Sequence, residues 1–282
     1  MKRIMTIQDI TCFGKCSVTI ALPVISAIGV ETAILPTALL SAHTLFPDNT
    51  KLDLGEEMPR IAGQWKRNGI SFDAIYIGYL GTDRGIETAL RVIDQFADEN
   101  TLVITDPVMG DHGRLYRGFD REYAGKCAEL CGKSDLIVPN ITEACLMTGM
   151  EYREKYDGSY LRDLCAGLCR ICAGTVVITG ASIEEGKTGF YGMRAETGES
   201  FSYQTERLNA SYHGTGDLFA STAAGAMVRG IHVQQALEIA ADYTAETIRE
   251  TMKGTENPWY GVHFETVIPY LIRRVEEALR ER

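Results

Sequence analysis

Residues 209–226 read NASYHGTGDLFASTAAGA, and the organisation of the whole chain can be worked out from this stretch. Gly214 and Gly216 open directly into an alanine-rich run that favours helix. The first turn of a helix has unpaired backbone N–H groups and partial positive charge, so it binds anions, phosphate above all. Because glycine has no Cβ, a phosphate can approach the backbone closely. The stretch therefore predicts a phosphate site at Gly214, Thr215 and Gly216.

Asp217 follows in the same turn, where a carboxylate suits anion binding poorly. It has a chemical use as a base that takes a proton from a hydroxyl group attacking the phosphate. An ordinary acidic residue in the first turn of a helix is an equally good interpretation of these residues alone.

Outward from this stretch, the chain alternates short apolar runs with longer amphipathic ones. We expect strands over residues 4–8, 31–35, 74–77, 102–105, 136–138 and 176–179. Helices are predicted over residues 18–28, 56–68, 86–97, 122–131, 142–148 and 160–172. The pattern ends with an antiparallel edge pair over 190–193 and 200–204, a helical segment from 217 to 252 and a helix over 265–279.

This alternation is typical of β-α-β units with a parallel sheet. We expect an α/β fold of three layers, α/β/α, with a mostly parallel, doubly wound sheet. No linker or repeat interrupts residues 1–282, so a single domain is predicted. Pro36 should end the second strand because it lacks an N–H donor, and residues 37–49 should be irregular.

In sheets of this kind, ligands lie at the carboxyl ends of the strands. This rule makes neighbours of five residues that follow the predicted strands: Asp9, Tyr79, Asp106, Asn140 and Gly180. The functional site is therefore expected at that edge, together with residues 214–217.

Asp106 and Asp111 lie close together after a predicted strand. Two carboxylates at the mouth of a parallel sheet are costly to hold together unless a cation or a proton lies between them. Mg²⁺ is the natural candidate because it is a hard ion that prefers oxygen ligands. A solvated turn is the alternative interpretation.

Asn140 and Glu143 follow the next strand with the spacing of a capping box, in which each side chain bonds the other's backbone. That structural interpretation is sufficient by itself. The functional one places Glu143 near the metal, which it would hold through water, since Mg²⁺ keeps several of its waters.

Residues 180–188, GASIEEGKT, almost match a P-loop but have five residues between the glycines where that motif has four. No helix is expected after them, and two glutamates would face the phosphates. We interpret the segment as a surface turn.

The composition restricts the class of partner. The chain has 282 residues, 45% of them hydrophobic, and a formal net charge of −10, so a large nucleic-acid interface is not expected. The weakly polar residues 18–30 are too short to span a bilayer and contain Pro23 and Gly29. The predicted location is therefore the cytoplasm, with no membrane partner.

Together these motifs resemble the ribokinase superfamily and, within it, the pyridoxal kinases. The superfamily marks are Gly-Thr-Gly-Asp at 214–217 and Asn-x-x-Glu at 140–143. Marks similar to the pyridoxal kinases are DPVMGD at 106–111 with GRLY at 113–116, SAHT at 41–44 and IGY at 77–79. The match runs over essentially the whole chain.

The resemblance implies ATP-dependent phosphorylation of the 5′-hydroxymethyl group of a vitamin B6 vitamer: pyridoxal, pyridoxamine or pyridoxine. ATP and Mg²⁺ would be the cofactors. Asp217 would be the base on that hydroxyl group. Backbone amides of Gly214, Thr215 and Gly216 would stabilise charge on the phosphoryl group in transfer.

The same resemblance implies roles around these residues. Asp106, Asn140 and Glu143 would organise Mg²⁺, with Asp106 and Glu143 as its ligands. Thr179 would line the nucleotide site, and Thr44 and Tyr79 would hold the substrate ring. The family is commonly dimeric, so a homodimer is expected, with a segment near residues 37–50 shielding the site.

Asp9 departs from the family pattern, which usually has serine near the pyridine nitrogen. We hypothesise that the Asp9 carboxylate pairs with a protonated ring nitrogen, a charge-assisted contact stronger than one to a hydroxyl group. Two alternatives for the whole protein are a hydroxymethylpyrimidine kinase of thiamine synthesis and a non-catalytic sensor of pyridoxal phosphate. The first often carries cysteine where this chain has Asp217.

Overall fold

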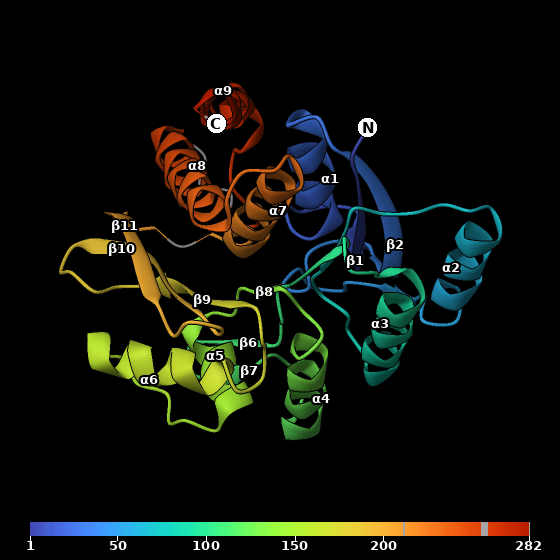
Figure 1. Ribbon diagram of the computed structural model, residues 1–282, viewed down its shortest axis with the longest axis horizontal. Coiled ribbons are helices and arrows are strands. Elements are labelled where there is room, and N and C mark those ends of the chain that lie inside the picture. The colour runs from blue at the N-terminus through green and yellow to red at the C-terminus, as the bar shows by residue number, and fades with distance from the viewer. Residues whose placement is uncertain (211, 255–258, 282) are drawn as a thin grey trace.

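The structure is a computed structural model that describes residues 1–210, 212–254 and 259–281, so Ser211 of the stretch quoted above lies outside it (Figure 1). Within these residues the strands form a nine-stranded sheet, in the order β11-β10-β9-β8-β5-β4-β1-β2-β3, and a small hairpin, β6-β7. The strands are β1 (Arg3–Thr11), β2 (Glu31–Leu40), β3 (Lys51–Asp53), β4 (Ala74–Ile77), β5 (Leu102–Thr105), β6 (Gly110–Asp111), β7 (Arg114–Leu115), β8 (Leu136–Ile137), β9 (Thr175–Ala181), β10 (Lys187–Arg194) and β11 (Ser200–Glu206). The helices are α1 (Val18–Ala27), α2 (Met58–Arg67), α3 (Asp83–Phe96), α4 (Arg121–Cys131), α5 (Ile141–Thr148), α6 (Gly158–Leu168), α7 (Thr215–Val228), α8 (Val233–Lys253), a 3₁₀ turn η1 (Glu265–Val267) and α9 (Ile268–Arg280).

The central strands β2, β1, β4, β5, β8 and β9 run parallel, whereas β3, β10 and β11 pair antiparallel at the two edges. The strand order reverses at β1, because β2 lies on one side of it and β4, β5, β8 and β9 on the other. The predicted mostly parallel, doubly wound sheet is thus confirmed.

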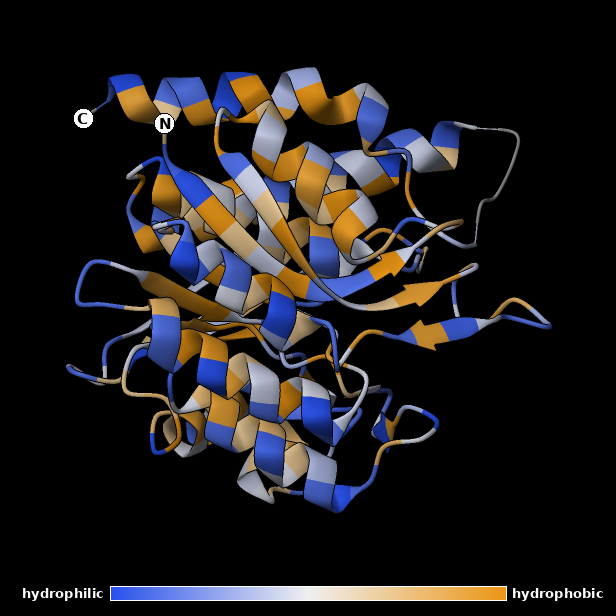
Figure 2. Cartoon of the chain, turned by 90° about the vertical axis from the view of Figure 1, so that its right-hand side faces the viewer, coloured by the Kyte–Doolittle hydropathy of each residue, from blue (hydrophilic) through white to orange (hydrophobic). Residues whose placement is uncertain are grey.

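Helices cover both faces of the sheet. In Figure 1, α1, α7, α8 and α9 gather on one side, and α2 to α6 lie on the other. Successive residues of β1 point to opposite faces. Ile4 packs in a core with α1, α7 and α8, and Met5 packs in a core with α2, α3 and α4. Figure 2 shows the resulting middle layer of largely hydrophobic strands between helices that alternate in hydropathy.

Two elements differ from the sequence prediction. Strand β2 continues through Pro36 to Leu40. Pro36 is tolerated because it lies beside a register shift in β1 and because β3 pairs only with residues from Ala38 onward. The helical segment expected over 217–252 is two helices, α7 and α8, because Gly230 adopts a φ of 93° between them.

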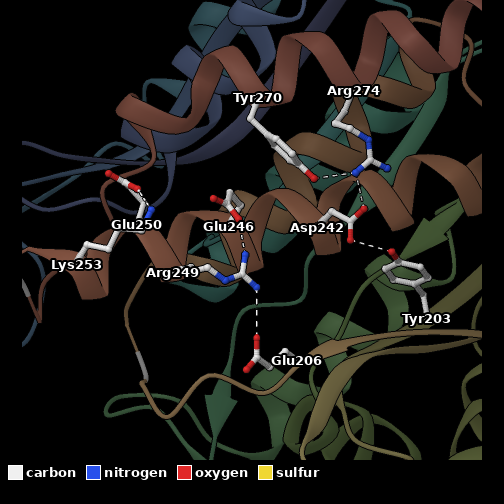
Figure 3. A network of polar contacts seen from close by, with 9 residues as sticks. All are labelled: Tyr203, Glu206, Asp242, Glu246, Arg249, Glu250, Lys253, Tyr270 and Arg274. Carbon is white, nitrogen blue, oxygen red and sulfur yellow. Dashed lines mark hydrogen bonds and ion pairs between the residues drawn. The ribbon is translucent and has the colours of Figure 1, made fainter.

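A polar network fastens edge strand β11 to α8 and α9 (Figure 3). Asp242 accepts hydrogen bonds from Tyr203 Oη at 2.8 Å and from Arg274 Nη1 at 2.7 Å. Arg249 pairs with Glu246 on its own helix and with Glu206 of β11 at 3.6 Å. The network holds α8 against the end of β11. Of the described helices, none is long and apolar enough to cross a bilayer.

Candidate active site

A cavity of about 520 Å³ opens beyond the carboxyl ends of β5, β8 and β9, where α7 begins. Eight of the residues predicted from sequence line it: Asp106, Asn140, Glu143, Thr179, Gly214, Thr215, Gly216 and Asp217. Gly180 lines it as well, and the turn over residues 182–186 joins β9 to β10 with no helix after it, as expected.

The turn before α7 has the geometry of an anion site. Gly214 adopts a φ of 81°, and a Cβ there would lie 2.0 Å from the Lys15 carbonyl oxygen, so only glycine fits. A Cβ on Gly216 would meet only the Asp106 carboxylate, at 3.8 Å. Within the described residues no side chain caps α7, so its first amides are free to bind an anion.

Asp217 lies in the first turn of α7 with its carboxylate half-buried. Burial raises its pKa to about 7, and the charge of Asp9 adds to this, whereas a hydrogen bond from the Ser17 backbone amide lowers it. A carboxyl group with a pKa near 7 is well matched to accept a proton at neutral pH.

Glu143 and Asn140 form the predicted capping box at the start of α5. The Asn140 side chain accepts from the Glu143 amide at 3.0 Å, and Glu143 Oε2 accepts from the Asn140 amide at 2.9 Å. Glu143 Oε1 also accepts from the Met109 amide at 3.0 Å. Burial nevertheless raises the pKa of Glu143 to about 7. The structural role is therefore confirmed, and it leaves this carboxylate poorly solvated.

Asp106 is buried at the end of β5, and burial, followed by the charges of Glu143 and Asp217, raises its pKa well above the ordinary value. Three carboxyl groups thus share one cavity with little solvent, an arrangement that a divalent cation would stabilise. The described part of the chain holds no cluster of three or more protein metal ligands. Mg²⁺ needs none, because it binds through one or two carboxylates, substrate phosphates and its own waters.

The three residues predicted to hold the substrate ring do not line this cavity. Asp9 is buried, with only 2% of its surface exposed, and lies near enough to Asp217 for its charge to raise the pKa of Asp217. Tyr79 is half-buried, and its pKa is raised to about 12 by burial and by the charge of Asp9, which places it near Asp9. Thr44 is exposed on the loop over residues 41–50.

That loop reaches across to the phosphate-binding turn. The His43 ring lies 4.3 Å from the ring of His213, which directly precedes Gly214. Burial and then His213 lower the pKa of His43 to about 4, so the contact joins two neutral rings at neutral pH. Phe46 on the same loop packs on Trp259 with ring centroids 4.6 Å apart. The loop thus contacts the residue before the phosphate-binding turn, and its role in shielding the site stays a prediction.

Sequence reasoning missed Ser17, Tyr116 and His213, which the structure brings to the site. Tyr116 is the last residue of the GRLY motif, and His213 directly precedes the Gly-Thr-Gly-Asp motif. Their positions in or next to these motifs could have indicated that they belong to the site. No motif marks Ser17.

Comparison with known proteins then identifies the family. A family model described as phosphomethylpyrimidine kinase matches residues 4–259. The chain belongs to this family. The protein is therefore a kinase, a phosphotransferase with an alcohol group as acceptor.

Similar solved structures share the fold over nearly the whole chain. One, titled a putative phosphomethylpyrimidine kinase from Bacteroides thetaiotaomicron in a form with pyridoxal, is 34% identical over 96% of this chain and 95% of its own, with a TM-score of 0.91. Pyridoxal kinase from Lactobacillus plantarum is 29% identical over 98% and 99%, with a TM-score of 0.90. Among curated proteins, a pyridoxine/pyridoxal/pyridoxamine kinase of Bordetella avium is 26% identical over 87% of this chain and 84% of its own.

Proposed function

We propose that the protein is an ATP-dependent pyridoxal kinase that phosphorylates the 5′-hydroxymethyl group of a vitamin B6 vitamer, giving the 5′-phosphate and ADP. One observation carries this proposal. Asp217 shares a cavity with the uncapped first turn of α7 and with Asp106 and Glu143. A base, a phosphate cradle and two metal-compatible carboxylates therefore converge at one place.

In this proposal Asp217 accepts the proton of the substrate hydroxyl group as its oxygen attacks the γ-phosphorus of ATP. The amides of Gly214, Thr215 and Gly216 stabilise negative charge on the phosphoryl group in transfer. Asn140 and Thr179 line the path of the nucleotide. Asp106 and Glu143 would hold Mg²⁺, which neutralises phosphate charge when it is bound.

The substrate ring is proposed to lie between the loop over residues 41–50 and the end of β4, against Thr44 and Tyr79. Pairing of Asp9 with the ring nitrogen stays a prediction, and both Asp9 oxygens already accept hydrogen bonds from neighbouring hydroxyl groups. The homodimer and the cytoplasmic location also stay predictions.

A hydroxymethylpyrimidine kinase is the second candidate, because the family model and one solved relative carry a phosphomethylpyrimidine name. The purified protein should be assayed for ADP formation with pyridoxal, pyridoxamine, pyridoxine, hydroxymethylpyrimidine and its phosphate. We expect turnover with at least one B6 vitamer at a kcat/KM well above that for either pyrimidine. Preference for a pyrimidine would favour the second candidate, and pyridoxal phosphate binding without any turnover would favour a sensor.

A further inference from the structure

Ser17, immediately before α1, has an unusual backbone conformation. Its φ of 52° and ψ of −132° lie close to a region that glycine alone adopts readily. Ser17 is nevertheless not glycine, and it is only 5% exposed. Such a conformation costs about 1–3 kcal/mol and persists only where the surrounding contacts impose it.

The contact that holds Ser17 is a hydrogen bond to a buried carboxylate. Ser17 Oγ donates to Asp9 Oδ1 at 2.5 Å, and Thr11 Oγ1 donates to Asp9 Oδ2 at 2.6 Å. Asp9 belongs to β1, so the bond ties the first residue before α1 to the middle of the sheet. Because Asp9 is held at both oxygens, it is a fixed anchor for the serine hydroxyl group.

The main chain of Ser17 acts on a second carboxylate, because its backbone amide lowers the pKa of Asp217. One residue therefore binds the Asp9 carboxylate through its side chain and influences the Asp217 carboxylate through its main chain. The segment before it also supports the phosphate-binding turn, since the Lys15 carbonyl lies where a Cβ on Gly214 would be.

We propose that Ser17 is a positioning residue for phosphoryl transfer: anchored by Asp9, it holds the Asp217 carboxylate in the direction of the substrate hydroxyl group. The inference rests on the proposed function and adds residues that act through Asp217 rather than on the substrate. It gives the backbone strain a function, because the strained conformation fixes the direction of the Ser17 amide. It also gives Asp9 a role that does not require contact with the substrate ring.

The test compares two substitutions at Ser17. Ser17→Ala removes the hydroxyl group, so the backbone relaxes and the amide leaves Asp217. We expect kcat to fall about 10- to 100-fold, the equivalent of the released strain, while KM for ATP stays within about twofold. Ser17→Gly also lacks the hydroxyl group but adopts the required φ without strain, so it should recover most of the lost kcat.

Two substitutions at Asp9 test the anchor. Asp9→Asn keeps an oxygen that can accept from Ser17 Oγ and should retain most of the kcat. Asp9→Ala should lose as much as Ser17→Ala, and the double variant should lose no more than either alone, because the two residues act as one unit. Two results together would overturn the inference: a raised KM for the vitamer in Asp9→Asn and an unchanged kcat in Asp9→Ala. They would indicate that Asp9 contacts the substrate ring instead of anchoring Ser17.

Ser159→Ala is the matched control, since Ser159 Oγ donates to Asp157 at 2.7 Å at the start of α6 and neither residue lines the cavity. Its kcat should equal that of the wild type. Wild-type kcat in Ser17→Ala would disprove the positioning role while leaving the kinase assignment intact. Absence of turnover in the wild-type protein would instead disprove the proposed function. If thermal melting shows that Ser17→Ala does not fold, the kcat values of Ser17→Gly, Asp9→Asn and Asp9→Ala still test the positioning role.

Discussion

At the scale of single residues, the two glycines of the phosphate-binding turn differ in what a side chain would meet. Gly214→Ala should lower the free energy of unfolding by about 1–3 kcal/mol and abolish turnover, because the methyl group would overlap the Lys15 carbonyl and the φ is positive. Gly216→Ala has room and should melt like the wild type. It should still lower kcat, since its methyl group would project toward Asp106 where the phosphoryl group is proposed to lie. Thermal melts and kinetics of both variants check this, and equal stabilities would contradict it.

Asp217 sets the expected pH dependence of the reaction. A base works only when ionised, and burial raises the pKa of this carboxyl group to about 7. The value of kcat should therefore fall as the pH drops below about 7 and reach a plateau above it. Asp217→Asn should lower kcat by orders of magnitude and remove this acidic limb, with the dissociation constant of ATP nearly unchanged. Near wild-type activity in that variant would exclude Asp217 as the base.

At the scale of elements, the link between β11 and α8 depends on Asp242, whose side chain is 17% exposed. Asp242→Ala leaves Tyr203 Oη and Arg274 without their shared acceptor and should cost about 1–3 kcal/mol of unfolding free energy. Denaturant melts measure this cost. Glu276→Ala removes an exposed partner of Arg280 and should change stability by less than about 1 kcal/mol. Equal losses would show that the network adds no more than a surface pair.

Helices and strands were predictable where the hydrophobic period of a segment and the turn residues at its ends indicate the same element. The strands at 74–77 and 102–105 and the hairpin of β10 and β11 follow from short apolar runs bounded by turn residues. Strand β3 and the hairpin β6-β7 are too short to show a period, so tertiary pairing alone creates them. Pro36 was misjudged because a proline on a partly unpaired strand removes no needed hydrogen bond.

At the scale of the whole molecule, residues distant in sequence meet at one edge of the sheet. The rule that ligands bind at the carboxyl ends of strands, together with the glycine turn, was sufficient to predict that Asp106, Glu143 and Asp217 share one cavity. The place of Ser17 could not be predicted, because its role depends on a backbone conformation that no propensity favours. The single-domain assignment stays a prediction.

The shared cavity predicts that Mg²⁺ stabilises the protein in the absence of substrate. An ion present at ten times its dissociation constant contributes about 1.4 kcal/mol, which raises Tm by a few degrees. Asp106→Asn should lose this rise. A potassium salt at equal ionic strength is the control for screening, and an equal rise with potassium would argue against a magnesium site.

The contact between the Lys15 carbonyl and Gly214 joins the beginning of the chain to its last third. The cradle for the triphosphate is therefore completed only once α7 docks on a sheet that is already in place. During synthesis, a ribosome-bound chain that has released β1 to β9 would carry Asp106 and Glu143 but neither Asp217 nor the phosphate-binding turn, so it could not yet transfer phosphate from ATP. In refolding from denaturant, recovery of turnover should accordingly lag behind recovery of the far-ultraviolet circular dichroism signal.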